Sequence, residues 1–121
     1  MSDELIDRSE QDRAEKDDKY FRERWLSDIR FIVKSKEGRR FYWGMMSKAG
    51  IFHEPFCGEK TNLTSYNLGR MSLGRDVLLK DLLEAKPEAY QQMQEEYKSE
   101  MISRKNIKIE ETKKTRESGL I

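Results

Sequence analysis

The sequence predicts an all-α protein, a small bundle of about four helices with a long charged N-terminal helix or arm. Apolar residues recur at intervals of three and four in four separate stretches, which is the spacing of one helix face. Glycine and proline fall between most of these stretches. The composition, 36% hydrophobic and 39% charged over 121 residues, supports one modest core that does not extend along the whole chain.

The same pattern divides the chain into three parts. Residues 1–19 carry mixed charges, and we expect a solvated helix extension or a disordered arm, or else an arm that orders on a partner. Residues 20–102 hold the apolar spacing and form the helical domain. Residues 103–121 are charged again, and we expect a frayed tail in which Ile107 and Ile109 dock as a short edge.

The first helix of the domain is expected to end near Lys34. Its apolar face is predicted from residues that step by four, four and three, with Leu26 and Val33 beside them: Phe21, Trp25, Ile29 and Ile32. The large Trp25 is therefore expected to anchor the core.

The second helix lies in the stretch SKEGRRFYWGMMSKAG, residues 35–50. Ser35 precedes it as an N-cap residue, and Gly50 follows it as the residue that most easily takes the left-handed conformation. Gly44 costs about 1 kcal/mol relative to alanine in a helix interior. We therefore expect Gly44 to mark a close contact with the first or third helix.

A loop follows, in which Pro55 and Gly58 exclude regular helix. The apolar side chains of this segment are expected to fold back over the core: Ile51, Phe52 and Phe56. The third helix is predicted over residues 66–83, with Thr64 or Ser65 as its cap.

Two glycines in the third helix, Gly69 and Gly74, lower its intrinsic stability and suggest tight packing. Pro87 then breaks the pattern and starts the fourth helix, where its missing N–H does no harm. Apolar residues repeat every three or four positions along that helix: Tyr90, Met93, Tyr97 and Met101. They form either core or, if exposed, an oligomer interface.

No catalytic motif is found, and we expect neither an enzyme nor a cofactor. His53 and Cys57 are the only histidine and cysteine, and Pro55 between them argues against a shared helix face, so we expect no metal site. One cysteine excludes an internal disulfide and fits a reducing cytoplasm. The opening residues MSDELIDRSE hold no apolar run, so we expect no signal peptide, and no stretch is long and apolar enough for a membrane span.

The arginines are the strongest binding candidates. Residues 31–80 contain nine basic and four acidic residues, an excess of five, whereas the whole chain has a net charge of +1. Four arginines in this part lie at a predicted helix start or follow a glycine: Arg39, Arg40, Arg70 and Arg75. They either bind an acidic partner or phosphate, or pair internally with nearby carboxylates, namely Glu37, Glu54 or Asp76. On the internal reading, Arg39→Ala and Arg70→Ala should disturb folding more than changes of surface lysines.

Residues 30–96 contain a series of short motifs, namely Arg30, Gly38-Arg39-Arg40-Phe41 with Trp43, Ala49-Gly50-Ile51-Phe52, Asn67-Leu68-Gly69-Arg70, Gly74-Arg75, and Pro87-Glu88-Ala89-Tyr90 with Met93 and Glu96. In these motifs and their order, the segment resembles a family of small tailed-bacteriophage proteins grouped under a Bordetella phage gene product. The third helix departs from the family pattern, because Leu68 stands where an acidic residue is usual and Met71-Ser72 where an asparagine is usual.

The resemblance implies a protein made during phage infection, and so a virion or host-cytoplasm location. We expect a non-enzymatic structural or internal, ejected virion component that acts through contacts with other virion proteins or with itself. The alternative is a non-virion regulator that binds nucleic acid or a host protein through the basic middle of the chain. An enzyme is the third and weakest interpretation.

Overall fold

The computed structural model describes residues 2–53 and 61–119, and this part of the chain contains helices and no strand. Along the sequence the elements are α1 (Ser2–Ile32), α2 (Lys36–Lys48), α3 (Thr61–Ser72), the π-helix η1 (Leu73–Leu79), α4 (Lys80–Ala85) and α5 (Pro87–Glu117). The elements α3, η1 and α4 follow one another without a break. They form one rod, so the described part has four rods, and the predicted all-α fold is confirmed.

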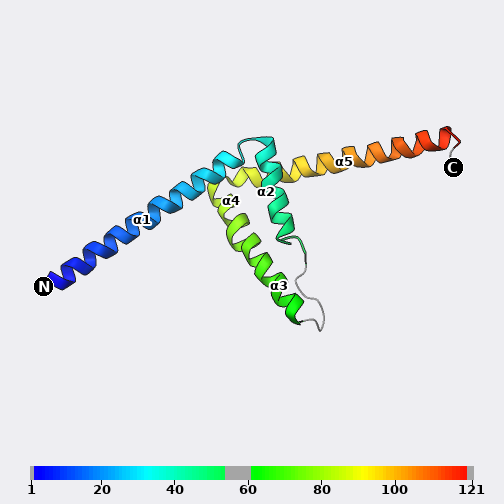
Figure 1. Cartoon of the computed structure of the whole chain (residues 1–121). Helices are drawn as coiled ribbons and strands as arrows, with labels where there is room; N and C mark the ends of the chain where they lie inside the picture. Colours follow the sequence, from blue (N-terminus) through cyan, green and yellow to red (C-terminus); the bar gives the residue numbers. More distant parts are fainter. Residues whose placement is uncertain (1, 54–60, 120–121) are drawn as a thin grey trace.

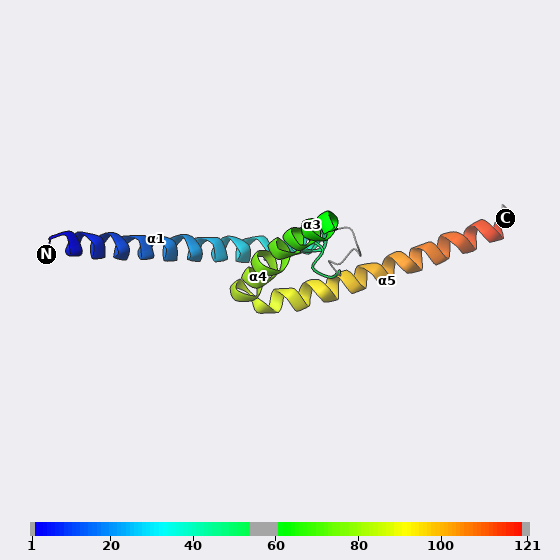
Figure 2. The same cartoon turned by 90° about the horizontal axis from the view of Figure 1, so that it is seen from below.

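Two long helices leave a small core in opposite directions. Figures 1 and 2 show α1 extending to one side and α5 to the other, with α2 and the α3–η1–α4 rod crossing between them. Residues 7–21 of α1 and residues 97–117 of α5 are exposed throughout. We call these two segments the α1 arm and the α5 arm. The residues expected as a frayed tail are therefore helical as far as Glu117, and the short edge predicted at Ile107 and Ile109 is wrong, because both are exposed positions of α5.

The core lies where the four rods meet. Its buried side chains are Leu26, Ile29, Val33, Tyr42, Met46, Ala49, Ile51, Leu82, Ala85, Ala89 and Met93. The face of α1 that faces the core is rotated by about one residue from the predicted one. Phe21, Trp25 and Ile32 are 53%, 46% and 40% exposed, so the prediction that they line the core is wrong.

The boundaries of α2 agree with the sequence. The Ser35 hydroxyl accepts a hydrogen bond from the Gly38 N–H at 3.0 Å, which satisfies one of the free donors at the helix start. Gly50 has φ +75° just past the helix end. Gly44, however, has no neighbour within 4 Å of an added Cβ, so the predicted close contact there is wrong.

The α3–η1–α4 rod begins at Thr61, earlier than the cap predicted at Thr64 or Ser65. A Cβ added to buried Gly74 would lie 2.3 Å from Ile51 Cγ2 and 2.7 Å from Ala49 Cβ. Tight packing is thus confirmed at Gly74. At Gly69 it is wrong, because nothing lies within 4 Å of an added Cβ.

The π-helical turns accommodate the close approach of the end of α2. A π-helix changes the local backbone hydrogen-bond pattern, and the Tyr42 hydroxyl of α2 donates to the carbonyl oxygen of Leu78 in η1. Ile51 is buried against the same region, as predicted. Phe52 is 47% exposed, and Phe56 lies outside the described residues. Pro87 is the first residue of α5, also as predicted.

Candidate interaction surface

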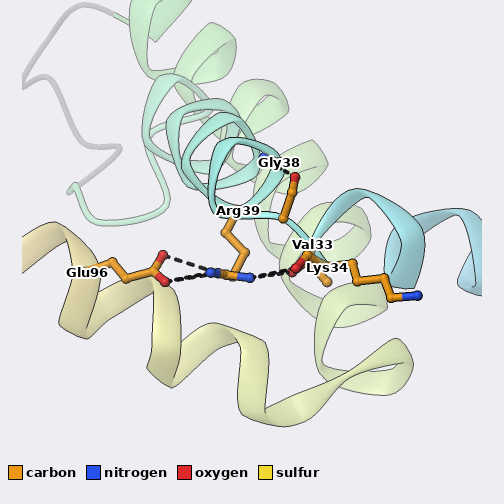
Figure 3. A network of polar contacts seen from close by, with 6 residues as sticks. Val33, Lys34, Gly38, Arg39 and Glu96 are labelled. Atoms are coloured by element: carbon orange, nitrogen blue, oxygen red, sulfur yellow. Dashed lines mark hydrogen bonds and ion pairs between the residues drawn. The ribbon is translucent and has the colours of Figure 1, made fainter.

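Arg39 joins three elements at the start of α2. Its Nε and Nη2 donate to the Glu96 carboxylate of α5 at distances of 2.8 to 3.2 Å. Its Nη1 donates to the carbonyl oxygens of Val33 and Lys34, at 3.1 and 3.0 Å, at the end of α1 (Figure 3). The Arg39 side chain is 11% exposed. Its three guanidinium nitrogens are thus used internally, and the Glu37 pairing considered from the sequence is not the one formed.

Arg40 takes no part in this network and is exposed. Together with Lys36 it lies on the α2 side of an open groove of about 560 Å³, whose α5 side carries Glu95 and Glu100. Trp43 lies among the lining residues. Of the four predicted arginines, Arg40 alone forms no hydrogen bond or ion pair within the described part of the chain, and it is therefore the one best placed to meet an anionic partner.

The other two predicted arginines lie at the opposite end of α2. Arg75 donates to the carbonyl oxygen of Ile51 at 2.9 Å and to that of His53 at 3.5 Å, so it fixes the segment that follows α2. Arg70 is exposed, and its guanidinium lies 5.7 Å from the centre of the Tyr66 ring. The four arginines therefore do not form one site. The Asp76 pairing considered from the sequence is also absent, since Asp76 accepts from Ser72. Glu54 lies outside the described residues.

Trp43 is the centre of an aromatic cluster that the sequence pattern did not reveal. Its ring centroid lies 5.0 Å from Phe52, 5.9 Å from Tyr90 and 5.5 Å from Tyr97. A tryptophan inside a helical apolar run predicts core, whereas here Trp43 is half-buried and lines the groove.

The predicted interface residues of α5 divide between core and surface. Met93 is buried and Tyr90 is half-buried, whereas Tyr97 and Met101 are 45% and 49% exposed. The stripe therefore begins in the core and continues onto the α5 arm. Exposed Tyr and Met are residue types enriched at protein interfaces.

A second polar network, also missed from the sequence, joins α1 to α4. The Asp81 carboxylate, 5% exposed, accepts from Arg22 Nη2 at 2.7 Å and from Trp25 Nε1 at 2.7 Å. Arg22 also donates to Glu84 at 2.5 Å. The hydrogen bond from Arg22 lowers the pKa of Asp81. The sequence contains one sign of this network, an aspartate inside the apolar run VLLKDLL, because a charged residue that becomes buried in such a run is normally paired.

The described residues form no cluster of metal-binding side chains. No three His, Cys, Asp or Glu side chains among them come together in a way that could hold a metal ion. His53 is exposed at the end of its described segment, and Cys57 lies outside the described residues. Within the same part of the chain, no helix combines the length and apolar character that crossing a membrane requires.

Comparisons with protein-family models, with curated proteins and with solved structures return no match to this chain.

Proposed function

We propose that this chain is a non-enzymatic bacteriophage protein, a small structural or internal, ejected virion component that acts through protein–protein contacts. The observation that carries the contact role is the pair of long helical arms. Neither arm has a core of its own, and both present large apolar side chains to solvent, among them Phe21 at 53% exposure and Ile102 at 61%. Helices in proteins owe most of their stability to the packing of an apolar face, and unpacked helices are marginal in water, so such arms are expected to pack on partners.

The phage assignment rests on the resemblance of residues 30–96 to the tailed-bacteriophage family. Several residues that carry this resemblance have architectural roles in the fold. Arg39 holds α1, α2 and α5 together, Gly74 admits the end of α2, and Pro87 starts α5. The residues that carry the resemblance therefore build the fold. They support a fold related to that of the family more directly than they support a binding partner shared with it. We place the protein in the virion, and in the host bacterial cytoplasm during infection.

The test is mass spectrometry of purified particles of a phage that encodes this chain. We expect its peptides in gradient-purified virions at several copies per particle, relative to the major head protein. A non-virion protein of the same phage serves as the contamination control. Absence from particles, with abundant protein in the infected cell, would overturn the virion role.

The alternative is a non-virion regulator that binds nucleic acid or a host protein. It is favoured by one observation, the exposed basic wall of the groove made by Lys36 and Arg40. A DNA-binding role requires a DNA affinity that falls steeply as the salt concentration rises. Arg40→Ala should then weaken binding to DNA of any sequence by a similar factor. A single host protein recovered from infected cells, with no binding to DNA, would instead indicate a host target.

A further inference from the structure

Among the described residues, both arms are exposed along their length and no other element covers them. Helices α1 and α5 make no contact with each other in the described structure, and the arms point away from the core on opposite sides (Figures 1 and 2). The described part of the chain thus leaves both arms open to a partner.

One face of the α1 arm is acidic. Residues at intervals of three and four lie on a single helix face, and here they are Asp7, Glu10, Ala14, Asp17 and Phe21, all exposed. Of the basic residues of the same arm, Arg8, Lys16 and Lys19 fall on other faces, and Arg13, three residues after Glu10 and four before Asp17, lies at the edge of this one. The five residues that define the face, which we call the acidic stripe, include three carboxylates and no basic residue, and they end at an exposed phenylalanine.

One face of the α5 arm is basic in the same manner. The spacing of three and four places together Met101, Lys105, Lys108, Thr112 and Arg116, all exposed. Of the four acidic residues of this arm, Glu100, Glu110 and Glu117 fall on other faces, and Glu111, three residues after Lys108, lies at the edge of this one. This basic stripe begins at an exposed methionine, at the end of the arm nearest the core.

The two stripes match in length and order. At a rise of about 1.5 Å per residue, Phe21 to Asp7 spans roughly 21 Å and Met101 to Arg116 roughly 22 Å. With the helices antiparallel and Phe21 opposite Met101, Asp17 lies opposite Lys105 and Asp7 lies within about one residue of the level of Arg116. The apolar ends meet near the core. Opposite charges meet at Asp17 with Lys105 and at Asp7 with Arg116, and between these two pairs Lys108 lies opposite Ala14 and Glu10 opposite Thr112.

From this complementarity we infer that a second copy of this chain covers the arms, in a two-fold dimer in which each acidic stripe lies antiparallel on the basic stripe of the partner. Because the arms leave the core in opposite directions, a two-fold axis across them brings both pairs together at once. Exposed ion pairs contribute little by themselves. The apolar ends near the axis, Phe21 with Met101, supply the buried centre, and the charges set direction and register.

This inference rests on the proposed function in one respect: both assign protein–protein contacts to the exposed arms, and here the partner is a second copy. If the chain is a dimer but is absent from particles, the virion role is refuted and the dimer is supported. If the chain is a monomer but is present in particles, the dimer is refuted and the virion role is supported.

The test uses the purified full chain and light scattering coupled to size exclusion. The chain has a mass of 14.5 kDa, so the dimer should read about twice that value. Raising the ionic strength from about 0.1 M to about 1 M shortens the Debye length from roughly 10 Å to roughly 3 Å. We expect the dissociation constant to rise at least about tenfold over that range, because the stripes attract through exposed charges.

Two charge-reversed chains sharpen the test, Glu10→Lys/Asp17→Lys and Lys105→Glu/Lys108→Glu. Each places like charges on both stripe contacts of its own homodimer, so each alone should be monomeric. An equimolar mixture should recover the dimer mass, because every contact in the mixed dimer again joins opposite charges. Recovery on mixing also shows that both variants are folded.

Matched controls change the same charges on the same arms but off the stripes, in Asp12→Lys/Glu15→Lys and Lys113→Glu/Lys114→Glu. Both should remain dimeric, with dissociation constants within about threefold of the parent. The inference is overturned by a parent chain that is monomeric at about 100 µM. It is also overturned by stripe and control variants that dissociate equally, by a mixture that stays monomeric, or by a mass well above that of a dimer.

Discussion

Arg22 and Asp81 join α1 to α4 across 59 positions of sequence, with Nη2 and Oδ1 2.7 Å apart. The Asp81 carboxylate is 5% exposed, and its second oxygen accepts from the Trp25 indole at 2.7 Å. This explains why Trp25 is 46% exposed although it belongs to an apolar run. Its ring nitrogen is held by a carboxylate at the core edge, and that bond places the ring beside the core instead of inside it.

The first prediction concerns acid. The hydrogen bond from Arg22 lowers the folded-state pKa of Asp81 below its ordinary 3.8, so its stabilising effect is present above that value and is lost as the pH falls through the folded-state pKa. The urea midpoint of the parent chain should therefore fall steeply below about pH 4. Asp81→Asn should lower the urea midpoint at neutral pH, and it should reduce the fall of the midpoint below about pH 4, which we call the acid limb. Glu84→Gln, which removes the exposed second acceptor of Arg22, is the control and should leave the acid limb in place.

The second prediction concerns alkali. Burial, with a further contribution from the charge of Asp81, raises the pKa of Tyr42 from 10.0 to about 12. A raised tyrosine pKa means that the unfolded chain loses this proton first, so stability should decline as the pH rises from about 10 towards 12. Tyr42→Phe removes the hydrogen bond to Leu78 and should cost about 1 kcal/mol at neutral pH.

Because Tyr42→Phe has no proton to lose, the difference between the two chains should shrink between about pH 10 and pH 12. Urea titrations at several pH values measure it. Tyr20→Phe, at a 61% exposed position, should follow the parent throughout. A constant gap between Tyr42→Phe and the parent would contradict the burial of the Tyr42 hydroxyl.

The third prediction sets two glycines against each other. Gly74→Ala forces a methyl to within 2.3 Å of Ile51 and should destabilise the chain by about 1–3 kcal/mol. Gly44→Ala meets nothing within 4 Å and should stabilise it by about 0.5–1 kcal/mol, because alanine is the better helix former. Thermal melts of the two variants should move in opposite directions. Destabilisation by Gly44→Ala would instead mean that a partner chain packs on that position.

The fourth prediction separates neighbouring arginines. Arg39→Ala leaves Glu96 and two carbonyl oxygens without their donor and should cost about 1–3 kcal/mol. Arg40→Ala should change stability by less than about 0.5 kcal/mol. Arg70→Ala, which the sequence ranks with Arg39→Ala, should resemble Arg40→Ala because Arg70 is exposed. Chemical denaturation of the three variants measures this order, and equal losses from Arg39→Ala and Arg40→Ala would show that the Glu96 pair adds little.

Local signals made several features predictable. The Ser35 cap, Gly50 past the end of α2 and Pro87 at the start of α5 each depend on the backbone needs of one or two residues, which can be read in the sequence. The apolar face of α1 was less predictable. Phe21, Trp25 and Ile32 fit the helical spacing as well as Leu26, Ile29 and Val33 do. Only the position of α4, with Asp81 pointing at Arg22 and Trp25, selects between the two faces.

The candidate site was harder to predict for a related reason. The sequence singled out four arginines by charge and by their neighbours, but charge does not tell whether a carboxylate from a distant helix lies opposite. Glu96, 57 positions from Arg39, accepts hydrogen bonds from the Arg39 guanidinium, whereas no carboxylate of the described residues pairs with Arg40. The aromatic cluster around Trp43 likewise gathers rings from α2, α5 and the segment after α2.

By itself, the sequence determined that the chain is helical, where several of its helices begin and end, and that its core is modest, because these follow from short-range backbone preferences and from the supply of apolar residues. The tertiary structure alone decided which face of α1 is buried, which arginine stays available and which glycine is tightly packed. These outcomes depend on contacts between residues far apart in the chain, and no local pattern specifies which distant side chain arrives at a given position.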